Sequence, residues 1–162
     1  MPAEPRFLLD ENFSHWLGEL LPRFEYAVQQ VQRIAELGEP HPRIQGLRHE
    51  ASDAELAEGC AEQDWILVTS DQDFRSRELR VRAYLGRGVG VILCTRQPAR
   101  LREQLELVVF SYPRWLESIA GSSRQPQLWF QHRLRGGLRS AEPEDDGDRA
   151  LRRETVISEH LP

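Results

Sequence analysis

The 162-residue chain contains no lysine, only two cysteines and no long apolar run. Cys60 and Cys94 are far apart and form no Cys-x-x-Cys pair, so neither a disulfide framework nor a thiolate zinc site is expected. No stretch approaches the roughly 20 consecutive apolar residues of a membrane span, and the first residues lack a basic-then-apolar signal pattern. We therefore expect a cytoplasmic protein with no membrane partner, in which both cysteines are buried small hydrophobic residues.

Two further kinds of site have little support in the sequence. Gly86, Gly88 and Gly90 precede an apolar run instead of following one, which disfavours a Gly-rich phosphate loop and a nucleotide cofactor. The histidines show no paired spacing of metal ligands; they are His15, His41, His49, His132 and His160. We interpret them as ordinary surface or loop residues.

The net charge of −5 conceals an uneven distribution along the chain. Residues 1–70 carry 13 acidic side chains and 5 arginines, residues 71–139 carry 6 and 13, and residues 140–162 carry 7 and 3. An acidic cluster beside a basic segment suits a metal-dependent nuclease, because carboxylates hold metal while arginines hold phosphates. A solvated basic face explains the arginines as well, so both interpretations stay open.

Apolar runs and helical patterns alternate along the first 120 residues. Strands are predicted at residues 6–9, 26–31, 65–68 and 89–93. Helices are predicted over residues 14–21, from the Ser52 capping-box pattern onward, over residues 74–85 and after Pro98, with a further short helix around Trp115. This alternation predicts a three-layer α/β/α sandwich with a central, mainly parallel sheet, in which sites form beyond the carboxyl ends of the strands.

The last quarter of the chain differs in character from the rest. We predict one domain over residues 1–120 and a C-terminal extension over residues 121–162, partly mobile because residues 141–148 form an acidic linker. Residues 126–138 mix aromatic side chains with arginine. They are expected either to form a hairpin or to dock on a partner, and the sequence does not decide between these.

Acidic side chains follow two of the predicted strands. Asp10 and Glu11 come after the first strand, and Asp71 and Asp73 follow the third, while Asp53 begins a helix. Because the carboxyl ends of parallel strands meet at one edge of a sheet, we expect these acids to converge. Clustered carboxylates are tolerated when a cation compensates them, and hard oxygen ligands favour Mg²⁺ or Mn²⁺.

The neighbouring polar residues have more than one interpretation. Thr69 and Ser70 are candidates for a hydroxyl near the metal, although Ser70 also suits a helix cap. Arg75 and Arg77 come directly after the TSDQDF motif and are candidates for phosphate contacts, although a solvent-facing helix needs such residues too. Each aspartate also has a structural explanation, because Asp53 lies in the first turn of its helix and Asp71 or Asp73 can cap the next one.

Four motifs in order carry a family resemblance: FLLDEN, ASDAEL, WILVTSDQDF and GVGVILC, over roughly residues 6–93. Together they resemble the PIN-like ribonuclease superfamily, most closely its short bacterial members of VapC type. The resemblance implies a Mg²⁺- or Mn²⁺-dependent endoribonuclease that cuts RNA, with catalytic metal ligands at Asp10, Asp53, Asp71 and Asp73. Glu11 is the neighbour of Asp10, and it either points away from the metal or supports the site. Many such proteins are toxins paired with a small antitoxin protein. The second acidic position is glutamate in many PIN domains, whereas the matching residue here is Asp53.

Other functions compete with this interpretation. A phosphoacceptor receiver domain has acids at similar strand ends, but its chemistry normally uses a lysine, which this chain lacks. A PIN-like scaffold that only binds a partner and a Toprim-like DNA nuclease are further alternatives. The segment after Gly121 is expected to bind an antitoxin, to pair with a second copy in a homodimer, or to contact RNA through Trp129, Phe130, Arg133 and Arg135.

Overall fold

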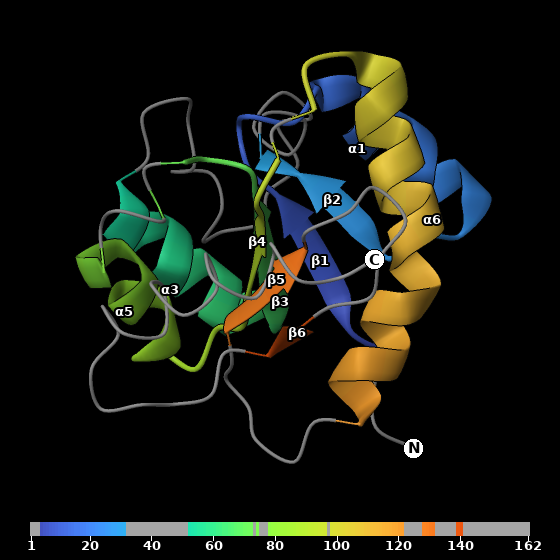
Figure 1. Ribbon diagram of the computed structural model, residues 1–162. Coiled ribbons are helices and arrows are strands. Elements are labelled where there is room, and N and C mark those ends of the chain that lie inside the picture. The colour runs from blue at the N-terminus through green and yellow to red at the C-terminus, as the bar shows by residue number, and fades with distance from the viewer. Residues whose placement is uncertain are drawn as a thin grey trace, which may run out of the picture.

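A central sheet covered by helices on both faces is visible in the computed structural model (Figure 1). The structure describes residues 4–31, 52–72, 74, 78–96, 98–121, 128–131 and 139–140. Its strands are β1 (Arg6–Leu9), β2 (Val28–Gln30), β3 (Trp65–Thr69), β4 (Val91–Cys94), β5 (Leu128–Gln131) and β6 (Arg139–Ser140). The helices are α1 (His15–Leu20), the short 3₁₀ helix η1 (Leu21–Phe24), α3 (Asp53–Gln63), α5 (Glu78–Leu85) and α6 (Leu101–Ala120).

The sheet has the strand order β2-β1-β3-β4-β5-β6. The first five strands in that order are parallel, and β6 pairs antiparallel with β5. The connection after β1 places β2 on one side of β1, and the connection after β2 returns the chain to place β3 on the other side. β1 and β3 are therefore neighbours although a long stretch of chain separates them. A crevice for ligands forms at such a switch point, at the carboxyl ends of the two strands.

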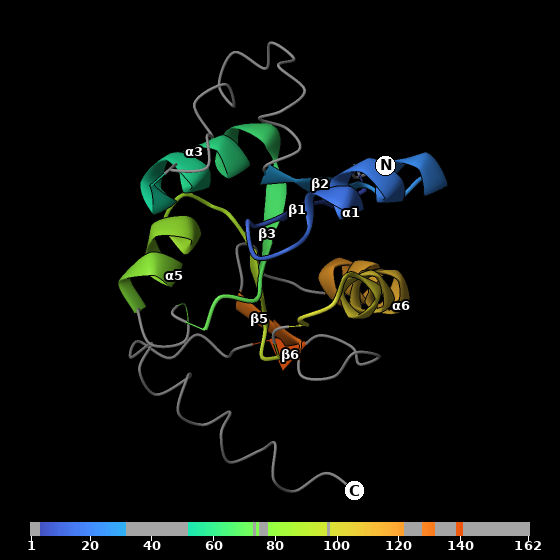
Figure 2. The same cartoon turned by 90° about the horizontal axis from the view of Figure 1, so that it is seen from above.

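Two apolar cores lie on opposite faces of the sheet. Viewed from above, α1 and α6 cover one face while α3 and α5 cover the other (Figure 2). Side chains alternate between the cores along β1, where Phe7 and Leu9 enter the first and Leu8 enters the second. The predicted three-layer sandwich with a mainly parallel sheet is therefore confirmed, and the continuous apolar runs are explained by strands buried on both faces.

Several predicted elements have the expected bounds within a few residues. The strand at residues 6–9 and the helix that begins after Ser52 agree with the prediction, and Cys60 and Cys94 are buried free thiols as expected. Pro22 ends α1 by starting η1. Residues 75–77, inside the predicted helix 74–85, lie outside the described residues.

One predicted boundary is wrong, because α6 is a single helix of 20 residues that passes through Pro113. The exposed proline loses a helix hydrogen bond, a defect that typically costs about 3 kcal/mol. The helix continues nonetheless, since Trp115 and Ile119 extend its buried stripe on the sheet beyond the proline. Packing of aromatic side chains outweighs the local defect.

The segment after residue 120 contributes two strands to the common sheet. β5 continues the parallel order beside β4, and β6 pairs with it in the antiparallel direction. The division into residues 1–120 and 121–162 stays a prediction. Among the helices that the structure describes, none is long and apolar enough to cross a membrane.

Candidate active site

The carboxyl ends of β1 and β3 bring two aspartates to the same edge of the sheet. Asp10 directly follows β1, and its backbone N–H continues the ladder to the carbonyl of Val68 at 3.0 Å. Asp71 comes two residues after Thr69, the last residue of β3. Both residues therefore lie at the switch point between β1 and β3.

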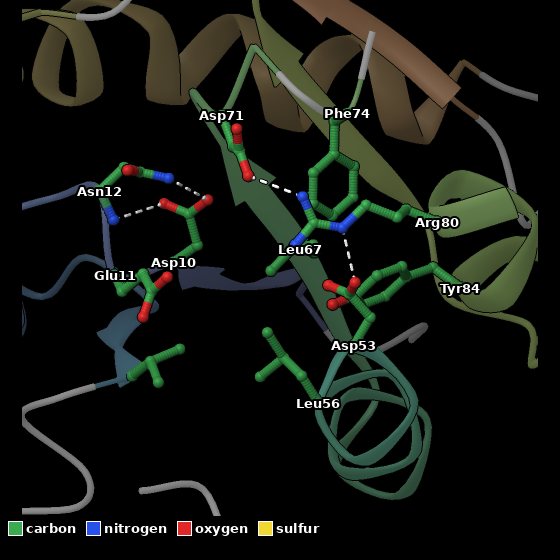
Figure 3. Close-up of a pocket in the computed structure, with 11 residues that line it drawn as sticks. Asp10, Glu11, Asn12, Asp53, Leu56, Leu67, Asp71, Phe74, Arg80 and Tyr84 are labelled. Carbon is green, nitrogen blue, oxygen red and sulfur yellow. Dashed lines mark hydrogen bonds and ion pairs between the residues drawn. The ribbon is translucent and has the colours of Figure 1, made fainter. Parts of the chain in front are cut away.

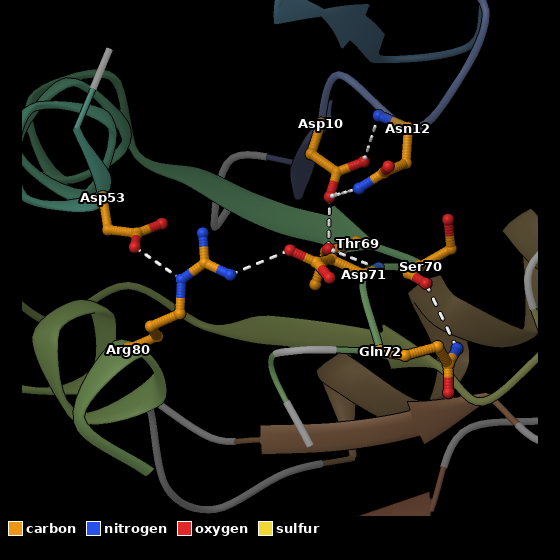
Figure 4. Close-up of polar contacts among 8 residues, drawn as sticks. All are labelled: Asp10, Asn12, Asp53, Thr69, Ser70, Asp71, Gln72 and Arg80. Atoms are coloured by element: carbon orange, nitrogen blue, oxygen red, sulfur yellow. Dashed lines mark hydrogen bonds and ion pairs between the residues drawn. The ribbon is translucent and has the colours of Figure 1, made fainter. Parts of the chain in front are cut away.

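Asp10 is a buried carboxyl group surrounded by donors. The backbone N–H of Asn12 donates to its Oδ1 at 3.0 Å and the Asn12 side-chain amide donates to its Oδ2 at 3.3 Å, while the Thr69 hydroxyl also donates to Oδ2 (Figure 4). Burial disfavours the charged form and raises the pKa of Asp10 to about 6, although these hydrogen bonds oppose the rise. The site thus contains a carboxyl group that is easily neutralised by a proton.

Thr69 connects the two strand ends. Its hydroxyl donates to Asp10 and accepts a 3.1 Å hydrogen bond from the backbone N–H of Asp71. The hydroxyl of Ser70 is buried and has no hydrogen-bond partner in the described part of the chain, whereas the Ser70 carbonyl accepts from Gln72 at 3.2 Å (Figure 4). Of the two hydroxyls predicted to support the site, the structure thus places that of Thr69 against an acidic side chain.

Two buried glutamines hold the loop that follows β1. Gln30, at the end of β2, donates to the carbonyl of Phe13 at 2.9 Å. Gln104, on the first turns of α6, accepts from the Ser14 backbone N–H at 2.8 Å and donates to the Pro98 carbonyl at 3.1 Å. These bonds satisfy backbone groups that the loop would otherwise bury unpaired. They fix the path that carries Asp10, Glu11 and Asn12 past the sheet edge.

Asp53 reaches the site from the start of α3. Ser52 caps this helix: its hydroxyl accepts from the Glu55 backbone N–H at 3.3 Å, and the Glu55 carboxylate accepts from the Ser52 backbone N–H at 2.8 Å. The capping box leaves the Asp53 side chain unused by the cap. It points instead toward the sheet edge (Figure 3).

Arg80, on α5, lies between two of the acidic side chains. Its Nε donates to Asp53 Oδ2 at 2.5 Å and its Nη1 donates to Asp71 Oδ2 at 2.8 Å (Figures 3 and 4). The guanidinium carbon also lies 4.8 Å from the centre of the Phe74 ring. The two carboxylates raise the pKa of Arg80, Asp53 foremost, so this side chain is a permanent cation in the site.

These groups line one pocket at the carboxyl edge of the sheet (Figure 3). Polar side chains from the β1 loop, the α3 start, the β3 end and α5 surround it over an apolar floor. The residues that line it are Asp10, Glu11, Asn12, Val31, Asp53, Leu56, Leu67, Asp71, Phe74, Arg80 and Tyr84.

The described side chains that line the pocket are of the kind that binds a divalent metal, but they are not arranged closely enough to hold one. Carboxylate and amide oxygens are the ligands that Mg²⁺ and Mn²⁺ prefer. Within the described ranges, however, no three His, Cys, Asp or Glu side chains are grouped closely enough to hold an ion. Arg80 occupies the space between Asp53 and Asp71, so the positive charge there is supplied by the chain itself.

The predicted site residues are only partly within the described chain. Asp10, Glu11, Asp53 and Asp71 line the common pocket, which is where the sequence places them. Asp73, Arg75 and Arg77 lie outside the described residues. Their metal-binding and RNA-binding roles stay predictions.

Four polar residues of the site and its support were not predicted from the sequence: Asn12, Arg80, Gln30 and Gln104. Asn12 belongs to the FLLDEN motif, so its position next to Asp10 was a usable signal. Arg80 is one of many arginines in a basic segment, and nothing local distinguishes it. The glutamines act through contacts between distant elements, for which a single sequence holds no signal.

The comparisons with known proteins bear on the same region of the chain. A family model described as a PIN like domain matches residues 5–96, which is more than half of the chain and includes every residue that lines the pocket. No curated protein and no solved structure matches.

Proposed function

Because the chain belongs to the PIN-like domain family, whose members are generally nucleases, we propose that it is a metal-dependent endoribonuclease that hydrolyses RNA phosphodiester bonds. The observation that carries this proposal is the meeting of Asp10, Asp53 and Asp71 in one pocket, from three separate elements. Acids placed only as caps or on solvated faces would not need to face a common cavity.

We assign the metal to Mg²⁺ or Mn²⁺, held by Asp10, Asp53 and Asp71 together with Asp73. When bound, such an ion supplies Lewis-acid activation of water and neutralises charge at the phosphodiester. The other residues of the chain prepare this site. Thr69 and Asn12 orient the Asp10 carboxyl group, and Glu11 is a further acidic side chain that lines the same pocket.

The RNA backbone requires positive charge near the pocket. Residues 71–139 carry 13 of the chain's 21 basic side chains, and this segment begins just after β3 and includes α5. Phosphate contacts from arginine position a nucleic acid without reading its sequence. We assign this role to Arg75 and Arg77, which follow Asp71 closely along the chain.

The proposal is tested by cleavage of structured and unstructured RNA by purified wild type and Asp71→Asn, with Mn²⁺, Mg²⁺ or EDTA, followed on denaturing gels. We expect metal-dependent cleavage by the wild type. Because the substitution removes a ligand charge while preserving shape, Asp71→Asn should lose about 100-fold or more in rate, the scale of removing one strong electrostatic contribution.

A matched control is Asp64→Asn, which neutralises an exposed aspartate at the C-terminal end of α3, outside the pocket. This variant should cut like the wild type. The proposal is wrong if Asp71→Asn retains wild-type activity, or if cleavage persists unchanged in EDTA.

A non-catalytic binding module is the second candidate function. The observation that favours it is the pairing of Arg80 with Asp53 and Asp71, which neutralises part of the pocket without metal. Absence of cleavage of RNA and of single-stranded DNA, combined with no measurable Mn²⁺ binding, would support this module.

The role as a toxin with a small antitoxin protein rests on the resemblance to VapC-type proteins. It predicts a small open reading frame beside this one whose product co-purifies with the chain and suppresses its cleavage of RNA. Co-expression of the two products followed by the gel assay tests this pairing.

A further inference from the structure

The pocket contains one positively charged side chain among its described lining residues, Arg80, beside the four acidic side chains of Asp10, Glu11, Asp53 and Asp71. The arginine lies where α3, β3 and α5 approach one another (Figure 3). Its position is therefore central to the pocket.

Three contacts fix the guanidinium group. Two ion pairs of 2.5 and 2.8 Å link it to Asp53 and Asp71, and its Cζ atom lies over the Phe74 ring. Phe74 is itself buried and packs against the Tyr84 ring at 5.7 Å. Unlike a surface arginine in a single exposed pair, this side chain is held by groups from separate elements, so its geometry is a property of the fold.

The same two carboxylates are the ones that a metal needs. Each uses an Oδ2 atom to accept a hydrogen bond from Arg80. A divalent ion beside a guanidinium cation is repelled, and a carboxylate oxygen that is already engaged is a poorer ligand. Metal and arginine therefore cannot both make their best contacts with Asp53 and Asp71.

We propose that Arg80 is a positioning residue, the resident cation of this pocket, which holds Asp53 and Asp71 in the metal-free chain and competes with the divalent metal for their oxygens. This inference rests on the proposed function, because it takes Asp53 and Asp71 as metal ligands. It accounts for the absence of a preformed three-carboxylate group in the described part of the pocket. Metal binding is then coupled to withdrawal of the guanidinium group.

The test is calorimetric titration of Mn²⁺ into wild type and Arg80→Met. Methionine keeps a long apolar side chain over Phe74 and removes the competing charge. We expect Arg80→Met to bind Mn²⁺ about tenfold tighter or more, since one unit charge a few ångströms from the ion is removed. In EDTA the same variant should unfold at a lower temperature than wild type, because two carboxylates lose their counter-charge, and Mn²⁺ should restore more of its stability.

Two further variants make the experiment selective. Arg23→Met removes an arginine from an exposed pair with Glu19 outside the pocket and should leave Mn²⁺ binding unchanged. Arg80→Lys keeps the charge, but its ammonium group cannot bridge both carboxylates as the forked guanidinium group does. Its Mn²⁺ affinity should therefore lie between those of wild type and Arg80→Met. This variant decides the question if Arg80→Met does not fold.

The outcomes separate this inference from the proposed function. Equal or weaker Mn²⁺ binding by both Arg80 variants overturns the role of Arg80, while metal-dependent cleavage by the wild type leaves the nuclease function standing. Tighter binding in the Arg80 variants without any cleavage supports the inference and contradicts the nuclease. If neither wild type nor the variants bind Mn²⁺, both proposals fail.

Discussion

At the scale of single residues, Asp10 is the group whose environment departs most from that of an ordinary aspartate. The residue is only 6% exposed, so an ionised carboxylate there must give up most of its hydration. The hydrogen bonds from Thr69 and Asn12 compensate in part. A protein that needed only a stable fold would be served better by a neutral side chain at this position, which suggests that the carboxylate is retained for function.

Asp10 makes the stability of the metal-free chain depend on pH. Its pKa is raised from 3.8 to about 6, so the folded chain binds the proton more tightly than the unfolded chain does. Its contribution to the unfolding free energy is therefore fully present below about pH 4 and is lost as the pH rises through about 6. The unfolding free energy falls by about 3 kcal/mol at most, because each unit of difference between the folded and unfolded pKa contributes about 1.4 kcal/mol.

Asp10→Asn removes this dependence, so the stability of the variant relative to wild type should rise between about pH 4 and about pH 6. The weakened hydrogen bonds to Thr69 and Asn12 add a penalty of about 1 kcal/mol that does not vary with pH. Urea unfolding of both proteins in EDTA at several pH values measures the difference. A difference that stays flat across this range would show that Asp10 is not desolvated as described.

At the scale of elements, local sequence patterns were enough to predict those helices and strands that are determined by residues close together in the chain. The Ser52-to-Glu55 pattern predicted the start of α3, and both bonds of the capping box are present. The apolar runs predicted β1 and β3, and the acids that follow them predicted the pocket. These features depend on neighbours within a few residues, which a single sequence displays.

Other elements depend on partners that are distant along the chain. β5 lies against Gly90, where an added Cβ would come 2.6 Å from Cζ3 of Trp129. Only the folded sheet reveals that this glycine makes room for that ring. For the same reason the sequence left residues 126–138 undecided and predicted a separate short helix around Trp115, where the structure has one continuous α6 packed against the sheet.

The loop after β1 depends on α6 through Gln104, which gives a prediction at this scale. Gln104→Met keeps the side-chain volume but leaves the Ser14 N–H and the Pro98 carbonyl without this partner. We expect a loss of about 2 kcal/mol in unfolding free energy. Faster hydrogen exchange at the amides of residues 12–14 should accompany it.

Gln63→Met serves as the matched control, since Gln63 is at the end of α3 and its side chain does not bond to the loop. It should change neither the unfolding free energy nor the exchange of these amides. If the two variants behave alike, the loop is held by Gln30 and its own turn, and the contribution of Gln104 is small.

At the scale of the whole molecule, the sheet topology brings the acidic residues together. β1 and β3 pair in register from Arg6 with Trp65 to Leu9 with Val68, which sets Asp10 and Asp71 at the same edge. The crossovers then bring α3 and α5 to one side of that edge, so that Asp53 and Arg80 reach the same pocket (Figure 2). The convergence of the acids follows from the parallel sheet, whereas the presence of an arginine among them does not.

The central claim is hydrolysis of RNA by water at a metal site, and the chemistry of the product ends tests it most directly. RNA cut by the wild type with Mn²⁺ should carry no 2′,3′-cyclic phosphate, and a substrate with 2′-O-methyl groups at the cut sites should still be cleaved, because the attacking group is water and not the neighbouring 2′-hydroxyl. Cyclic phosphate ends, or complete resistance of the methylated RNA with intact binding, would contradict the account.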